Sequence, residues 1–120
     1  MRKRMYRARR RMNHVVSELS HALLLAGGKE INLRLTREED GLRLHLEGDF
    51  SPKHQRGMEH MANLLQPKFR DPALVETYGE LTGEELYTDE CELALVGQML
   101  DESKVTVEPG RVRMDLFLAF

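Results

Sequence analysis

Cysteine, tryptophan and long apolar runs are almost absent from this 120-residue sequence. Cys91 is its single cysteine, which excludes an internal disulfide and a cysteine-rich zinc site. No apolar run is longer than that at residues 22–26, which covers about one turn of helix, whereas a membrane span needs about 18 apolar residues. No apolar signal-peptide core follows the N-terminus. We therefore expect one domain over residues 1–120, located in the cytoplasm and without a membrane span.

Charge is unevenly distributed, although the formal net charge is only −2. Residues 1–11 hold 7 of the 18 lysines and arginines, which leaves 11 basic against 20 acidic residues in the remainder. This basic N-terminal extension could contact nucleic acid, anionic lipid or the acidic body of a second copy. We favour the second copy, because no helix-turn-helix, RNA-binding or zinc-finger motif accompanies the arginines and only Tyr6 offers a ring for base stacking.

One long helix is predicted at the N-terminus, from about residue 3 to residue 26. Apolar residues recur in it at a spacing of three and four: Met5, Ala8, Met12, Val15, Leu19, Ala22 and Ala26. Gly27 and Gly28 are expected to end the helix, because glycine readily adopts the left-handed C-cap conformation. At about 1.5 Å per residue the helix is roughly 34 Å long. Since that exceeds a small domain, its first turns are expected to project and to pair with another subunit.

Two hairpins are predicted in the rest of the chain. Alternating apolar residues over 31–35 and 42–46 indicate two strands that bury one face, joined by a turn over 38–41 in which Gly41 supplies a positive φ. The second hairpin joins strands at 105–107 and 112–118 through the turn Pro109-Gly110.

Helices are predicted between the two hairpins. One spans about residues 55–66, and another begins after Thr88, which is a favourable N-cap residue. The inner face of the second consists of Leu93, Val96, Gly97 and Leu100. The sequence therefore predicts an α+β fold: a two-layer sandwich in which helices cover one face of a mostly antiparallel, mixed sheet made of two hairpins.

This order of elements and two local strings resemble the histidine-kinase-like ATPase superfamily, which has the GHKL or Bergerat fold. The string VVSELSHAL at 15–23, followed by Gly27-Gly28-Lys29 and a hairpin, is similar to the family's N-box helix and first two strands. The string LALVGQML at 93–100 is similar to the helix after the second glycine box, and the closing hairpin follows it. The resemblance covers about residues 12–50 and 89–118.

The residues with which that family binds ATP and magnesium are replaced throughout. Ser17 and His21 stand at the N-box positions. Gly48 and Phe50 stand in the first glycine box, and Glu90 and Glu92 stand in the second. Two carboxylates at the second box would repel a triphosphate where the fold should offer backbone donors. The resemblance therefore implies a degenerate member without ATPase activity and without a cofactor.

His14, Glu18 and His21 follow one another at i, i+4 and i+7 on the polar face of the first helix. We interpret them as a solvated surface with a local His–Glu pair. The alternatives are a phosphoacceptor histidine at His14 or His21 and a metal site made by the three side chains. His54 and His60 offer no ligand-like partner at a fixed spacing, and we predict neither a metal nor a catalytic residue.

These observations predict a non-catalytic interaction module of bacterial signal transduction, which forms a homodimer and binds an unidentified signalling protein. The predicted interface lies on the first helix and combines an apolar seam with basic residues: Met5, Ala8, Met12, Val15 and Leu19 with Arg7, Arg10 and Arg11. Two alternatives stay open. One is a diverged ATP-binding kinase or ATPase of the same fold in which His21 replaces the metal-binding asparagine. The other is a nucleic-acid-binding protein that uses the basic extension.

Overall fold

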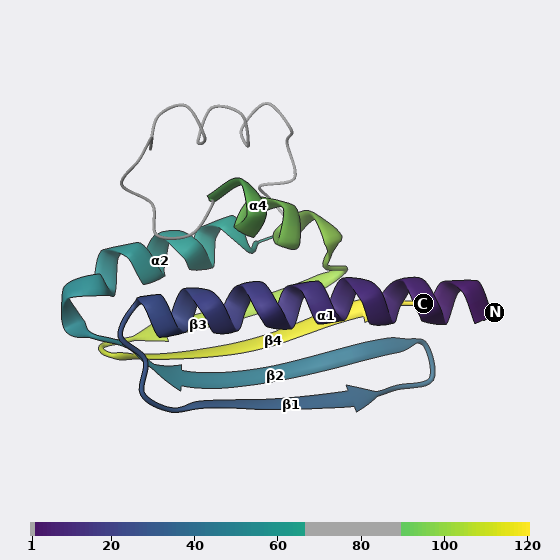
Figure 1. The fold of residues 1–120 in the computed structure, drawn as a ribbon, viewed down its shortest axis with the longest axis horizontal. Helices are drawn as coiled ribbons and strands as arrows, with labels where there is room; N and C mark the ends of the chain where they lie inside the picture. Colours follow the sequence, from purple (N-terminus) through teal and green to yellow (C-terminus); the bar gives the residue numbers. More distant parts are fainter. Residues whose placement is uncertain (1, 67–89) are drawn as a thin grey trace.

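The predicted two-layer α+β fold is confirmed by a computed structural model, which describes residues 2–66 and 90–120 (Figure 1). The elements, in chain order, are α1 (Arg2–Leu25), β1 (Ile31–Arg37), β2 (Gly41–Asp49), the 3-10 helix η1 (Pro52–His54), α2 (Gln55–Leu64), α4 (Glu90–Met99), β3 (Glu102–Glu108) and β4 (Arg111–Ala119). The sheet has the order β1-β2-β4-β3, and every described pairing is antiparallel rather than mixed. The N-cap predicted at Thr88 lies outside the described residues.

Helix α1 ends as its two glycines predict. Gly27 has a φ of 89°, and its N–H donates to the carbonyl of Leu24 at 3.1 Å. The N–H of Gly28 donates to the carbonyl of Leu23 at 2.9 Å, which completes a Schellman motif. The N–H of Ser51 then donates to the carbonyl of Ala26 at 2.9 Å, so the end of α1 is tied to the end of the first hairpin.

The apolar stripe of α1 packs on the sheet of its own chain, where α1 contacts β2 and β4. Four members of the predicted dimer seam are almost completely buried there: Ala8 3%, Met12 1%, Val15 0% and Leu19 0% exposed. Met5 is half-buried at the open end of the stripe. The stripe is therefore filled within the monomer and is not free to form a seam with a second copy. Burial of these side chains is the main favourable contribution to holding the two layers together.

The helix layer covers β2, β4 and β3 but leaves β1 uncovered beyond Ile31. Leu33 and Leu35 of β1 pair with Leu46 and Leu44 of β2, so all four point to the helix side of the sheet. The two leucines of β2 are fully buried, whereas Leu33 is 41% and Leu35 52% exposed. The expectation that both strands bury their apolar face is thus corrected for β1. Figure 1 shows the reason, because β1 is the strand farthest from α2 and α4.

Gly41 is required for a different reason from the predicted one. Only Gly27 and Gly110 have a positive φ among the described residues, and Gly41 already belongs to β2. A Cβ at Gly41 would collide with the carbonyl oxygen of Leu118 and with the ring of Phe117 on β4. The glycine therefore permits close approach of two central strands rather than an unusual backbone angle.

The outer face of the sheet is polar, and several of its charges are paired within the chain. Arg43 donates from Nη1 to Asp115 at 2.7 Å and from Nε to Glu38 at 2.9 Å, and its guanidinium lies 4.8 Å from the centre of the Phe117 ring. The hydrogen bonds to Glu38 and Asp115 raise the pKa of Arg43 above its ordinary value. Arg43 thus covers the one large aromatic ring that this face carries among the described strands.

Helix α4 approaches the end of α2 at a glycine. A Cβ on Gly97 would lie 2.5 Å from the carbonyl oxygen of Leu64 and 3.2 Å from the Cα of Leu65. Both neighbours are backbone atoms that cannot rotate away. By contrast, a Cβ on Gly57, in the exposed part of α2, meets nothing within 4 Å.

We expect Gly97→Ala to destabilise the protein by about 1–3 kcal/mol, because the added methyl group separates α4 from α2. Gly57→Ala is the matched control and is expected to stabilise it by about 0.5–1 kcal/mol, since alanine loses less backbone entropy in a helix. Urea unfolding followed by circular dichroism measures both. Equal stability of Gly97→Ala and the unmodified protein would contradict the close approach of the helices.

Candidate functional site

The positions that correspond to the N-box and the first glycine box of the resembled family lie in different surroundings. Ser17 and His21 are exposed on α1, whereas Gly48 is buried in β2. Phe50 directly follows β2, is 4% exposed, and belongs to the hydrophobic core. Its ring therefore serves packing at the place where the family has a glycine.

Asp49, beside the altered first box, anchors the chain between α1 and β1. Its Oδ1 accepts the backbone N–H groups of Glu30 and Lys29, each at 2.9 Å. The bond from Glu30, followed by that from Lys29, holds the pKa of Asp49 below its ordinary value. Through Oδ1, the carboxylate thus fixes the start of the first hairpin.

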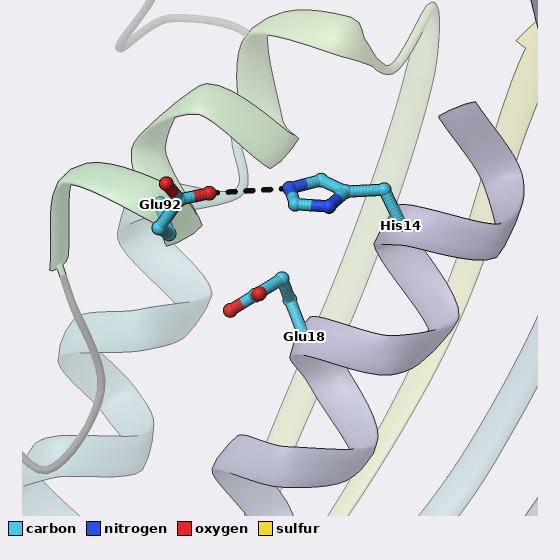
Figure 2. A group of neighbouring side chains, drawn as sticks. All are labelled: His14, Glu18 and Glu92. Atoms are coloured by element: carbon cyan, nitrogen blue, oxygen red, sulfur yellow. Dashed lines mark hydrogen bonds and ion pairs between the residues drawn. The ribbon is translucent and has the colours of Figure 1, made fainter. Parts of the chain in front are cut away.

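A cluster of three potential ligands lies between α1 and α4, and we call it the α1–α4 cluster: His14, Glu18 and Glu92. Nε2 of His14 is 3.2 Å from Oε2 of Glu92. Glu18 lies one helical turn from His14, on the same face of α1. One ligand atom from each residue can be chosen so that all lie within 4.8 Å of one another. Figure 2 shows the three side chains pointing into the space between the two helices.

The cluster differs from the set that the sequence indicates. His14 and Glu18 belong to both, but Glu92 takes the place of His21, which lies exposed farther along α1. Glu92 is 78 residues from His14 in the sequence, so no spacing rule could connect them. The sequence places Glu92 only at an altered phosphate-binding position, and the packing of α4 against α1 brings it to His14.

The electrostatics of the cluster favour a cation. Two carboxylates and one imidazole meet there, and Glu18 has no hydrogen bond or ion pair with any residue in 2–66 or 90–120. The side chains of His14 and Glu92 are 42% and 38% exposed, so small ions from solvent can reach them. Like-charged carboxylates at this separation repel each other unless a proton or a cation lies between them.

The basic residues of α1 form a second exposed surface. Arg7, Arg10 and Arg11 are all exposed, and the guanidinium of Arg10 lies 5.8 Å from the centre of the Tyr6 ring. Figure 1 shows the N-terminal end of α1 extending past the ends of the strands. The first helical turns therefore project as predicted. The apolar stripe of α1, however, is packed on the sheet of its own chain.

The third exposed surface is the β1 strip, which we define as Ile31, Leu33 and Leu35. Ile31 is half-buried and the two leucines are exposed on the helix side of an edge strand. An edge strand also presents unpaired backbone N–H and C=O groups along its outer side. Pairing of a strand with a second chain requires free backbone groups and apolar side chains, and β1 offers both.

The chain matches no family model, no curated protein and no solved structure. The likeness to the histidine-kinase-like ATPases therefore stays a prediction from the sequence. No helix within the described ranges is long and apolar enough to cross a membrane.

Replacement of Asp49 by asparagine is expected to destabilise the protein in a pH-dependent manner. Because the pKa of Asp49 is lowered in the folded state, its carboxylate contributes fully to stability above the unfolded-state pKa of about 3.9. This contribution to stability is lost as the pH falls through the folded-state pKa. The free energies of unfolding of the unmodified protein and of Asp49→Asn should differ most near neutral pH and become equal in strong acid. Denaturant unfolding at a series of pH values measures this, and a difference that is independent of pH would contradict the role of the carboxylate charge.

Proposed function

We propose that this chain is a non-catalytic interaction module of bacterial signal transduction, which acts in the cytoplasm as a homodimer. The observation that carries the proposal is the exposure of Leu33 and Leu35, at 41% and 52%, on the helix side of an edge strand. The proposal keeps the predicted homodimer but moves its interface from the buried stripe of α1 to the β1 strip. The basic residues of α1 stay available for the signalling partner.

The absence of catalysis is supported by the chemistry of the altered boxes. Phe50 fills the core in place of a box glycine, and Asp49 is used by two backbone N–H groups. The carboxylates of Glu18 and Glu92 lie between α1 and α4, the helices that correspond to those flanking magnesium and the phosphates in the resembled family. Negative charge there opposes a triphosphate instead of binding it.

A second copy suits the β1 strip because the strip can pair with itself. Two edge strands related by a two-fold axis run antiparallel, and residues directly opposite each other point to the same face. If the axis passes beside Leu33, this residue meets its own copy, Ile31 meets Leu35 of the second chain, and Asn32 meets Arg34. All the apolar residues of the strip then lie together, and no arginine faces an arginine in the paired segment.

We expect the protein to have twice its 13.9 kDa chain mass at tens of micromolar, as measured by sedimentation equilibrium or light scattering. Leu33→Lys is expected to give a monomer with unchanged circular dichroism, because the charge repels its copy across the axis. Leu95→Lys is the matched control, since Leu95 is 44% exposed on α4, far from β1, and should leave the dimer intact.

Cross-linking fixes the register of the same interface. In a Cys91→Ser background, Leu33→Cys should oxidise to a covalent dimer, because Cβ atoms of directly opposed residues lie about 4.5–5.5 Å apart. Leu95→Cys should not. A monomeric unmodified protein, or equal cross-linking at both positions, would contradict the proposed dimer.

Non-catalytic function predicts that ATP and ADP do not bind. Calorimetric titration at millimolar nucleotide, with and without magnesium, is expected to give no heat of binding and no shift in the thermal unfolding temperature. Saturable, magnesium-dependent binding would instead favour the diverged kinase or ATPase. In that case Glu92→Gln should strengthen binding, because it removes a charge facing the phosphates.

A further inference from the structure

The geometry points to a divalent transition-metal site at the α1–α4 cluster, with His14, Glu18 and Glu92 as protein ligands and zinc as the ion that fits best. The site is independent of the proposed dimer, because it lies between α1 and α4 and includes no residue of β1. Its effect would be to join the N-terminal helix to the C-terminal half of the fold.

The distances in the cluster are close to those of a coordination shell. Two atoms bound to a tetrahedral zinc at about 2.0–2.2 Å lie roughly 3.3–3.6 Å from each other. Nε2 of His14 and Oε2 of Glu92 are already 3.2 Å apart, and the most distant pair in the cluster lies within 4.8 Å. Glu18 must therefore move its carboxylate by about an ångström, which its partly exposed side chain can do by rotation.

The charge of the cluster matches a divalent cation. With His14 neutral, Glu18 and Glu92 contribute two negative charges that one M²⁺ ion compensates. The ion would replace the proton that Nε2 of His14 shares with Glu92 in the hydrogen bond, and it would give Glu18 the partner that it lacks among the described residues.

The ligand types select the class of metal. Imidazole nitrogen with carboxylate oxygen suits zinc, cobalt and nickel, whereas calcium and magnesium prefer a shell made only of oxygen atoms. Three protein ligands leave at least one coordination position for water. Because the ligands come from two separate helices, only the folded chain offers them together, and an ion bound there should stabilise the native state.

Zinc titration of the full chain in a Cys91→Ser background tests the proposal without a contribution from the thiol. We expect one equivalent to bind and to raise the thermal unfolding temperature, and Co²⁺ to give the visible absorption of a nitrogen- and oxygen-bound ion. His14→Ala, Glu18→Gln and Glu92→Gln should each weaken zinc binding at least tenfold. His21→Ala on the same helix and Glu59→Gln on α2 are matched controls and should leave it unchanged. An excess of Mg²⁺ or Ca²⁺ should not compete.

The outcomes separate the metal site from an ordinary ion pair. If zinc causes neither heat nor a thermal shift, or if the His14 and Glu92 variants bind it as well as their background does, the proposal is wrong. Loss of binding in His21→Ala with retention in Glu92→Gln would place the ion on α1 alone and would also overturn it. Because the side chains of His14, Glu18, His21, Glu59 and Glu92 are partly or fully exposed, substitutions at these positions are expected to leave the fold intact. Circular dichroism verifies this for each variant and for the Cys91→Ser background.

Discussion

The packing of α1 across the two central strands is the interaction on which the rest of the structure depends. Val15, Leu19 and Leu23 of the helix are fully buried against a sheet whose centre is formed by β2 and β4. With that face buried, the opposite face of α1 must carry the polar residues, and this includes His14 and Glu18. The glycine cap at the end of the helix then sets where β1 begins, so the position of the first hairpin follows from the same contact.

One helix layer that covers only part of the sheet accounts for both candidate sites. On one side, α4 packs beside α1 and α2 and brings Glu92 to His14. On the other side, β1 extends beyond the helices and leaves two leucines in contact with solvent. The first arrangement gathers charge in a space between helices, and the second exposes apolar surface on an open edge. No further helix within residues 2–66 and 90–120 covers that edge, and the proposed second chain would do so.

Most of the fold was predictable because it follows from local patterns. The apolar spacing of α1, its terminal glycines and the alternation in the hairpins act over a few residues, and the structure agrees with them. Burial is not local: the same alternation predicts a buried Leu44 and a buried Leu35, and only the position of β1 in the sheet separates them. The stripe of α1 was likewise identified as apolar, but whether it meets its own sheet or another chain is decided by tertiary packing. The pairing of His14 with Glu92 has no sequence signal at all, since it depends on two helices at opposite ends of the chain.

Amide hydrogen exchange, followed as a function of protein concentration, tests the proposed self-pairing of β1. If β1 pairs with itself, its amides exchange more slowly as the concentration rises, because their outward N–H groups become hydrogen-bonded in the dimer. Those of β3, the other edge of the same sheet, should not change and serve as the internal reference. Exchange in β1 that is independent of concentration, or protection that develops in β3 instead, would contradict self-pairing through β1.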